Sequence, residues 1–234
     1  MRSRAQRCPN CLIPPAFCVC QVAALETVST RVTVVIHFSD AVRMTNTGKM
    51  VPIVLANSEV LIRGEKQAPL DISRAILPDH DNILLYPSPA SEPLTPAYLS
   101  TIRRPINLIV PDGNWNQAGK MVRREKLLHA IPHVHLPRGK PSRYRLRTAA
   151  HDNWLATFEA VARALGTIEN AELQARLEYF FDVLVERILF LKGKLPPDQV
   201  TGGITRQMIR QYHTDNDDRA FLAAQAKISR RDSS

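Results

Sequence analysis

The stretch INLIVPDGNWNQAGKMVRR, residues 106–124, carries the clearest signal for the fold. Its first five residues are mainly apolar, which is typical of a short strand covered on both faces, and a Pro-Asp-Gly turn follows them. Residues 116–130 then show the pattern of a basic helix. A buried strand that leads directly into a helix is the building unit of parallel α/β sheets.

Similar units occur on both sides of this stretch. Three further apolar runs predict strands at residues 32–38, 83–86 and 133–136, and helical patterns lie between the strands at residues 49–56, 96–102 and 116–130. Thr47 is the expected N-cap of the first of these helices. The alternation predicts an α/β fold with a mainly parallel sheet.

The pattern becomes purely helical after residue 153. Apolar residues recur at helical spacing through residues 155–165 and 171–191, and a Gly-Lys-Leu-Pro-Pro segment at residues 193–197 ends the second run. We therefore expect three parts: a cysteine-rich knuckle at residues 1–25, an α/β domain at residues 26–195, and a helical, basic C-terminal extension at residues 196–234.

Composition limits the kind of partner. The 234-residue chain is 44% hydrophobic and 23% charged, which is ordinary for a globular protein, but it carries a formal net charge of +9. Such a positive charge favours a polyanionic partner. The sequence shows neither a secretory signal nor an uninterrupted apolar run of the roughly 18 residues that a membrane span needs. We expect a cytoplasmic protein that does not interact with membranes.

All four cysteines lie in the first twenty residues, as the pairs Cys8/Cys11 and Cys18/Cys20. Two disulfides would suit a secreted protein, and free or redox-active thiols are a further alternative. Four thiolates in two close pairs also suit tetrahedral zinc, which stabilises segments too short for a core of their own. We favour a structural zinc site, because four cysteine ligands leave no open position for catalysis.

A basic segment without acids follows the third expected helix. Residues 126–151 contain no Asp or Glu, and the sequence PRGKPSRYRLR at residues 137–147 interleaves a tyrosine with arginines. Arginine binds phosphates bidentately and stacks on bases, so we expect RNA contacts here, although a solvated face is the alternative. The expected RNA-binding residues are Arg123, Arg124, Lys140, Arg143, Arg145 and Arg147.

Three expected strands run directly into a proline followed by a small or charged residue: Pro87-Ser88, Pro111-Asp112-Gly113 and Pro137-Arg138-Gly139. In open parallel sheets, ligands bind at the carboxyl ends of the strands, so these turns predict a binding site. Simple chain termination is the alternative. Neither glycine-rich phosphate-binding fingerprint is present.

Several motifs occur together in one order: His37 with Asp40, TNTGKM (45–50), NSEVLIRG (57–64), LLYPS (84–88), IVPDGNWNQAGKM (109–121), SRYRLR (142–147) and LATFEA (155–160). Together with the cysteine knuckle, this order resembles that of DTW-domain proteins over about residues 8–190. The Asp-Thr-Trp that names the family corresponds to Asp112-Gly113-Asn114-Trp115, with Asn114 in place of threonine. Asp40 stands where the family carries glutamate.

The resemblance implies a fold and an activity. DTW-domain proteins resemble bacterial tRNA-uridine aminocarboxypropyltransferases, relatives of the SPOUT superfamily, whose parallel sheet is knotted. The implied reaction transfers the 3-amino-3-carboxypropyl group of S-adenosylmethionine to N3 of a tRNA uridine, in the variable loop, and releases methylthioadenosine. The alternatives are a SPOUT-type RNA methyltransferase and a non-catalytic, zinc-containing RNA-binding protein. Monomer and dimer both remain open.

The resemblance also suggests site residues. Asp112 is the first candidate for the base that removes the N3 proton, and Glu159 is the second, or binds the amino group of the transferred chain. Alternatively, Asp112 caps the following helix and Glu159 is a solvated helix residue. Trp115 is expected to stack on adenine or uracil, with packing under the loop as the alternative. The expected S-adenosylmethionine contacts are Tyr86, Pro87, Ser88, Asp112, Gly113, Trp115, Arg138, Tyr144 and Thr157.

Overall fold

A computed structural model describes residues 6–65, 67, 69–146 and 154–215 of the chain. Its sheet has six strands in the order β2-β1-β5-β3-β6-β4, and all five neighbouring pairs are parallel. This confirms the α/β class and the parallel sheet. The strands are β1 (Arg31–His37), β2 (Ser58–Arg63), β3 (Asp81–Leu85), β4 (Glu92–Pro93), β5 (Ile106–Asp112) and β6 (His133–His135).

Strand β5 lies inside the sheet, and all seven of its residues are buried. Side chains of alternate strand residues enter two different cores. Val34 of β1 and Leu108 of β5 belong to the larger core, whereas Val35 and Ile109 belong to the smaller core on the other face. Because both faces are covered, these strands have a nearly continuous apolar sequence.

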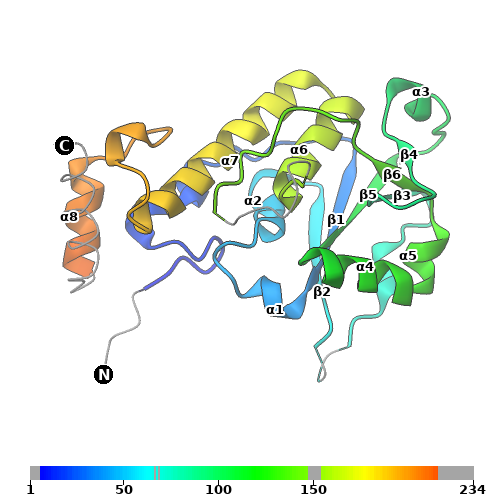
Figure 1. Cartoon of the computed structure of the whole chain (residues 1–234), viewed down its shortest axis with the longest axis horizontal. Coiled ribbons are helices and arrows are strands. Elements are labelled where there is room, and N and C mark those ends of the chain that lie inside the picture. The colour runs from blue at the N-terminus through cyan, green and yellow to red at the C-terminus, as the bar shows by residue number, and fades with distance from the viewer. Residues whose placement is uncertain (1–5, 66, 68, 147–153, 216–234) are drawn as a thin grey trace.

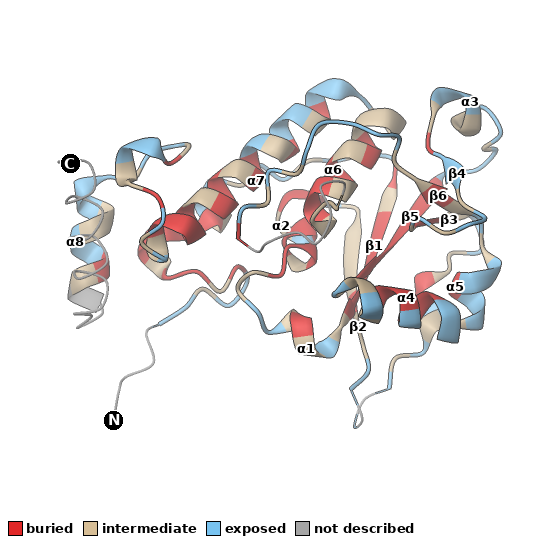
Figure 2. Ribbon diagram, in the orientation of Figure 1, coloured by how far each residue is buried: buried red, intermediate tan, exposed pale blue. Residues whose placement is uncertain are grey.

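Helices cover the two faces unequally, as Figure 1 shows. The larger core contains buried side chains of α2 (Val51–Val54), α6 (Thr157–Ile168) and α7 (Ala171–Leu191), and the smaller core contains those of α4 (Trp115–Arg124) and α5 (Lys126–Ala130). In Figure 2 the inner faces of these helices are buried and their outer faces are exposed. The remaining elements are α1 (Phe38–Ala41), α3 (Pro96–Leu99), α8 (Arg206–Asp215) and the 3-10 turns η1 (Pro15–Phe17), η2 (Val19–Gln21), η3 (Gly48–Met50), η4 (Ile72–Ala75) and η5 (Pro197–Gln199).

The four strands expected from the sequence are confirmed, each with boundaries within two residues of those predicted. Strands β2 and β4 were not predicted. Both are edge strands. β2 carries Glu59 and Arg63 among its apolar residues, and β4 is only two residues long and contains Pro93, so neither has the pattern of a buried strand.

The helix at residues 171–191 is confirmed, but three other predicted helices were too long. The helix expected at residues 116–130 is broken at Glu125, whose ψ of 100° is not helical. The helix expected at residues 49–56 is only Val51–Val54, because Leu55 adopts an extended conformation and pairs with Glu26. The helix expected at residues 96–102 ends at Leu99. Thr47 makes no capping bond; its hydroxyl accepts a hydrogen bond from the Phe158 amide at 3.3 Å.

The N-terminal segment packs into the larger core. The ring of Phe17 lies 5.3 Å from the ring of Phe190 in α7 and 5.3 Å from that of Tyr212 in α8. The cysteine-rich segment and α8 are thus joined to the sheet domain by buried contacts. The division of the chain into three parts stays a prediction. None of the described helices combines the length and the apolar character needed to cross a membrane.

Candidate active site at the carboxyl edge of the sheet

The first of two neighbouring cavities lies beside the carboxyl ends of β3, β5 and β6 and has a volume of about 410 Å³. Its walls are mainly apolar and aromatic, which suits a flat, weakly polar ring. The lining residues are Leu85, Tyr86, Pro87, Val110, Pro111, Gly113, Trp115, Ala118, His135, Leu136, Trp154, Leu155, Thr157 and Ala160.

The second cavity is smaller, about 270 Å³, and is more polar. Two carboxylates, the amides of two asparagines and several hydroxyls face it, so it can bind cationic and hydrogen-bonding groups. It is lined by Asp40, Thr45, Asn46, Thr47, Asp112, Gly113, Asn114, Trp115, Ser142, Tyr144, Trp154, Leu155, Ala156 and Thr157. The two cavities share Gly113, Trp115, Trp154, Leu155 and Thr157, and therefore adjoin.

An aromatic pair forms part of the shared wall. The rings of Trp115 and Trp154 lie 4.9 Å apart at an angle of 36°, and Tyr86 lies 6.2 Å from Trp115 on the side of the apolar cavity. Trp115 is only partly buried, so packing does not cover all of its surface. This arrangement gives the two cavities an aromatic wall of the kind on which flat rings stack.

Asp112 ends β5 and lies in the polar cavity with only 5% of its surface exposed. Asn46 donates a hydrogen bond to Oδ2 at 2.5 Å, and the Thr157 hydroxyl donates one to Oδ1 at 2.5 Å. Burial raises the pKa of Asp112, and the nearby charge of Asp40 raises it further, whereas the two hydrogen bonds act in the opposite direction. The carboxyl group is thus oriented by two donors, and its pKa lies above the usual aspartate value.

Gly48 makes room for this carboxyl group. A Cβ atom at residue 48 would lie 2.5 Å from Oδ2 of Asp112 and 3.0 Å from a methyl carbon of Val34. The glycine in TNTGKM therefore allows the backbone to approach the acid closely.

Asn114, and not Asp112, caps α4. Its side chain accepts a hydrogen bond from the Gln117 amide at 2.9 Å, and the Gln117 side chain accepts one from the Asn114 amide at 2.7 Å. This capping box leaves Asp112 outside the helix, so the alternative role of Asp112 as a helix cap is wrong. Asparagine fills a position that threonine can also fill, because both side chains accept a hydrogen bond from the first turn.

Asp40, the second acid of the polar cavity, comes from α1 and is 4% exposed. Its carboxylate lies 3.1 Å from the guanidinium of Arg43, one turn along the chain. Nearby, Lys49 donates a hydrogen bond to the Arg43 carbonyl at 2.5 Å, and burial lowers the pKa of Lys49 to about 8.

Glu159 is only 2% exposed, so its alternative role as a solvated helix residue is wrong. Its carboxylate accepts hydrogen bonds from the Ser142 hydroxyl, from the Arg143 amide at 2.7 Å and from the Ala156 amide at 3.2 Å. It is absent from the described linings of both cavities. These contacts favour a role in holding the loop before α6, and the catalytic role remains an untested prediction.

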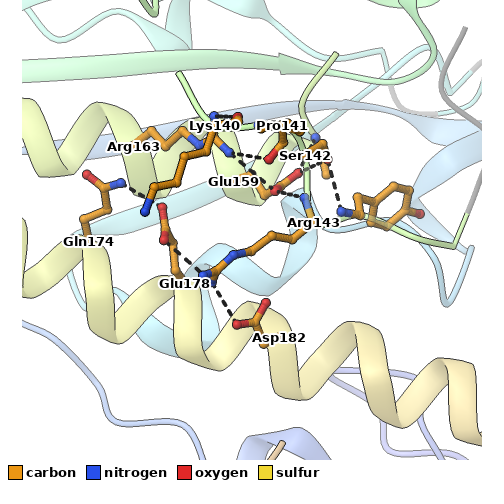
Figure 3. Close-up of polar contacts among 11 residues, drawn as sticks. Lys140, Pro141, Ser142, Arg143, Glu159, Arg163, Gln174, Glu178 and Asp182 are labelled. Carbon is orange, nitrogen blue, oxygen red and sulfur yellow. Dashed lines mark hydrogen bonds and ion pairs between the residues drawn. The ribbon is translucent and has the colours of Figure 1, made fainter. Parts of the chain in front are cut away.

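The basic residues expected to bind RNA fall into two groups. Arg143 and Arg145 form ion pairs with acids of α7: Arg143 with Asp182 at 2.8 Å, and Arg145 with Glu186 at 2.6 Å (Figure 3 shows the first). Lys140 is exposed, as are Arg123 and Arg124 in the last turn of α4. Arg147 lies outside the described residues.

Most of the expected cofactor contacts lie at the two cavities, but two do not. Tyr86, Pro87, Gly113, Trp115 and Thr157 line the apolar cavity, and Asp112 and Tyr144 line the polar one. Ser88 and Arg138 are in neither described lining; the Ser88 hydroxyl is hydrogen bonded to His133 at 2.8 Å.

Several lining residues were not among the site residues predicted from the sequence, and four of them could have been found from their position. These four are Asn46, His135, Trp154 and Leu155. Asn46 and Leu155 lie within motifs already noted, TNTGKM and LATFEA, and Trp154 directly precedes the second, so motif position was an available signal. His135 ends β6, where strand-end position alone could have marked it.

The four cysteines converge as the spacing predicts. Their sulfur atoms all lie within 4.8 Å of one another, with Cys8 to Cys20 at 3.8 Å and Cys11 to Cys18 at 3.7 Å. Zinc–thiolate bonds of about 2.3 Å in a tetrahedron place sulfur atoms about 3.8 Å apart. The donor set and its geometry therefore fit a structural zinc ion.

A buried cation next to the cysteines also supports a zinc site. Arg187 of α7 is 5% exposed and donates hydrogen bonds to the carbonyls of Phe17 and Cys18 at 3.2 and 2.9 Å. Within the described part of the chain, its Nε has no hydrogen-bond partner and its guanidinium forms no ion pair with a carboxylate. A buried cation needs a counter-charge, and a zinc ion with four thiolates carries two negative charges.

The fold and the site define an α/β protein with two adjoining cavities at the carboxyl edge of a parallel sheet and a cysteine knuckle near its N-terminus. The DTW domain matches residues 5–189, and the chain belongs to the DTW-domain family. The chain is similar to tRNA-uridine aminocarboxypropyltransferase 2 of Mus musculus, with 23% identity over 172 residues. The match covers 71% of this chain but only 57% of that relative's length. No solved structure matches the chain.

Proposed function

We propose that this protein is a tRNA-uridine aminocarboxypropyltransferase, which transfers the 3-amino-3-carboxypropyl group of S-adenosylmethionine to N3 of a tRNA uridine in the variable loop. The observation that carries the proposal is the position of the family's own motif. Gly113 and Trp115 line both the apolar and the acid-bearing cavity, and Asp112 lies in the second. A SPOUT-like relationship of the fold is part of the proposal and is supported by the parallel sheet with its site at the carboxyl edge.

The two cavities differ in a way that suits the two ends of the donor. The apolar cavity, with Tyr86 and Trp115, suits the adenosine part, because aromatic and apolar walls favour a purine ring. The polar cavity, with Asp40 and Asp112, suits the cationic amino group and the acceptor uracil. A ligand that spans the shared wall would present its sulfonium near Trp115 and Thr157, between the cavities.

Asp112 is the residue that we propose to accept the uridine N3 proton. Uracil N3 is a weak nucleophile until this proton leaves, and a carboxylate with a raised pKa is a suitable acceptor. Asn46 and Thr157 hold the carboxylate in one orientation while it receives the proton. When bound, S-adenosylmethionine supplies a carbon activated by the sulfonium: the N3–carbon bond forms, the carbon–sulfur bond breaks, and methylthioadenosine leaves as a neutral thioether.

Exposed cationic residues outside the two linings are proposed to bind tRNA phosphates. Lys120, Arg123 and Arg124 are exposed on α4, the helix that begins at Trp115, and Lys140 is exposed on the loop after β6. Phosphate contacts of this kind position a nucleic acid without reading its sequence.

The products distinguish this reaction from its alternatives. Purified protein is incubated with S-adenosylmethionine and unmodified tRNA, with Asp112→Ala as the control. We expect methylthioadenosine in a one-to-one ratio with modified uridine, and neither product with the variant. Release of S-adenosylhomocysteine would indicate a methyltransferase, and tRNA binding without either product would indicate a non-catalytic RNA-binding protein; both results would overturn the proposal.

A further inference from the structure

The loop at residues 140–146 has alternating side-chain directions. Ser142 and Tyr144 line the polar cavity, whereas Arg143 and Arg145 are exposed on the other side and pair with acids of α7. Leu146 then returns to the larger core. Successive side chains of this loop therefore make different contacts: Ser142 and Tyr144 with the polar cavity, and Arg143 and Arg145 with the acids of α7.

Three acids receive the arginines. Glu178, Asp182 and Glu186 follow one another at intervals of four residues along α7, and so share one face of that helix. Arg143 lies 2.8 Å from Asp182 and 3.6 Å from Glu178, and Arg145 lies 2.6 Å from Glu186. Burial raises the pKa of Asp182, repulsion by Glu186 and Glu178 raises it further, and Arg143 lowers it, so this row of acids favours a nearby cation.

The backbone of the same loop is held from α6, as Figure 3 shows. Arg163 donates hydrogen bonds to the carbonyls of Lys140 and Pro141 at 2.7 and 3.1 Å, and Glu159 accepts one from the Arg143 amide at 2.7 Å. Both side chains are well buried, with 16% and 2% of their surface exposed. Hydrogen bonds to buried charged groups are among the stronger ones in proteins.

The inner side of the loop is held in the cavity by two further contacts. The Tyr144 hydroxyl donates a hydrogen bond to the Thr45 carbonyl at 2.7 Å, and its ring stacks on Phe181 of α7. The Ser142 hydroxyl donates to Glu159 and accepts a hydrogen bond from the Tyr144 amide at 3.1 Å.

From this geometry we infer that Arg143 and Arg145 are positioning residues, which clamp the loop to α7 so that Ser142 and Tyr144 form the wall of the polar cavity, and that they are not RNA-phosphate ligands. The clamp itself is a property of the free protein; its effect on catalysis rests on the proposed function. The inference is an alternative to the sequence-based prediction for SRYRLR, in which the arginines contact RNA.

A charge-exchange experiment tests the inference. The variants are Arg143→Asp, Asp182→Arg and the double variant that carries both changes, which restores an opposite-charge pair with the charges exchanged. In the double variant, the new arginine at residue 182 also lies one turn from both Glu178 and Glu186. Arg138→Asp is the matched control, because it makes the same charge change in the same basic stretch and no ion pair of Arg138 is recorded within the described residues.

Amide hydrogen exchange of residues 140–146 in the free protein is the first readout. We expect Arg143→Asp to accelerate exchange at least about tenfold, the double variant to restore protection, and Arg138→Asp to leave it unchanged. Unchanged exchange in Arg143→Asp, or no recovery in the double variant, would overturn the clamp. Because this measurement needs no substrate, its result does not depend on whether the protein catalyses the transfer reaction.

Steady-state kinetics is the second readout. The clamp predicts that Arg143→Asp lowers kcat about tenfold or more with little change in the KM for tRNA, and that the double variant recovers. A phosphate ligand would behave differently: the KM for tRNA would rise, its salt dependence would weaken, and exchanging the charge with Asp182 would not restore it. That second pattern would overturn the inference, whereas a wild-type protein without transferase activity would instead refute the proposed function.

Discussion

At the scale of single residues, the proposed reaction depends most on Asp112. It is buried, it is held by Asn46 and Thr157, and its pKa is raised by burial. We expect Asp112→Asn to lower kcat by about a hundredfold or more, because general-base catalysis typically contributes 10²- to 10⁴-fold. Binding of S-adenosylmethionine, measured by calorimetry, is expected to survive in this variant. Full activity of the variant would show that the carboxylate is not the base.

The same pKa gives two pH dependences with opposite signs. Activity is expected to rise with pH through the raised pKa, because the base must be deprotonated. Stability is expected to fall in the same window, above the usual aspartate pKa of about 3.9, since the folded protein holds the proton to higher pH than the unfolded chain does. Urea denaturation of the wild type and of Asp112→Asn over a pH series measures this: the variant should gain in relative stability as pH rises through the window. A pH-independent difference would contradict the raised pKa.

A substitution at Gly48 tests whether the position of the Asp112 carboxylate matters. In Gly48→Ala the new methyl group would lie 2.5 Å from Oδ2 of Asp112, so the loop or the carboxylate must move. We expect a loss of about 1–3 kcal/mol in the free energy of unfolding, as is typical of overpacking, together with reduced kcat. Gly203→Ala is a useful contrast, because no atom lies within 4 Å of its added Cβ and only its backbone strain, at φ of 73°, would act there.

At the scale of elements, α4 connects the family motif to the fold. Its capping box fixes the turn that aims Asp112 and Trp115 at the cavities. Asn114→Ala should lower the free energy of unfolding by about 1 kcal/mol, while Asn114→Thr, which restores the residue the family carries, should retain most of it. Chemical denaturation of both variants measures the difference, and equal losses would show that capping is not the function of this side chain.

The sequence predicted the buried elements better than the elements at the edges of the sheet. The inner strands, including β5, were predictable because a strand covered on both faces must be apolar along its length. The edge strands β2 and β4 and the break at Glu125 were not, because they depend on neighbours distant in sequence. In the site, too, local features were predictable and distant contacts were not. Asp112 and Trp115 could be predicted because they follow a strand end. The ion pairs of Arg143 and Arg145 could not, because their partners in α7 lie 39 and 41 positions away in the sequence.

At the scale of the whole molecule, α7 connects the cysteine knuckle with the loop at residues 140–146. Its Arg187 contacts the Phe17 and Cys18 carbonyls, and Asp182, a little over one turn away, holds Arg143. Because one helix contacts both segments, we expect a structural change at the knuckle to alter the position of the loop.

Removal of zinc tests the structural role of the knuckle. We expect chelation, or Cys11→Ser, to lower the midpoint of thermal unfolding, because a structural zinc site contributes folding free energy directly. Arg187→Met is expected to weaken zinc binding, measured by competition with a chromogenic chelator, since it removes the positive charge beside four thiolates. Isolated protein that contains no zinc and is unaffected by chelators would contradict a structural zinc site.

The central claim is that the aminocarboxypropyl group, and not the methyl group, reaches a tRNA uridine. It is tested most directly with two preparations of S-adenosylmethionine, one labelled in the aminocarboxypropyl chain and the other in the methyl group, each incubated with the protein and unmodified tRNA. We predict that only the first transfers its label to tRNA, on a uridine identified by nucleoside mass spectrometry, and that Asp112→Asn abolishes the transfer. Label in tRNA from the methyl group, or from neither preparation, would contradict the claim.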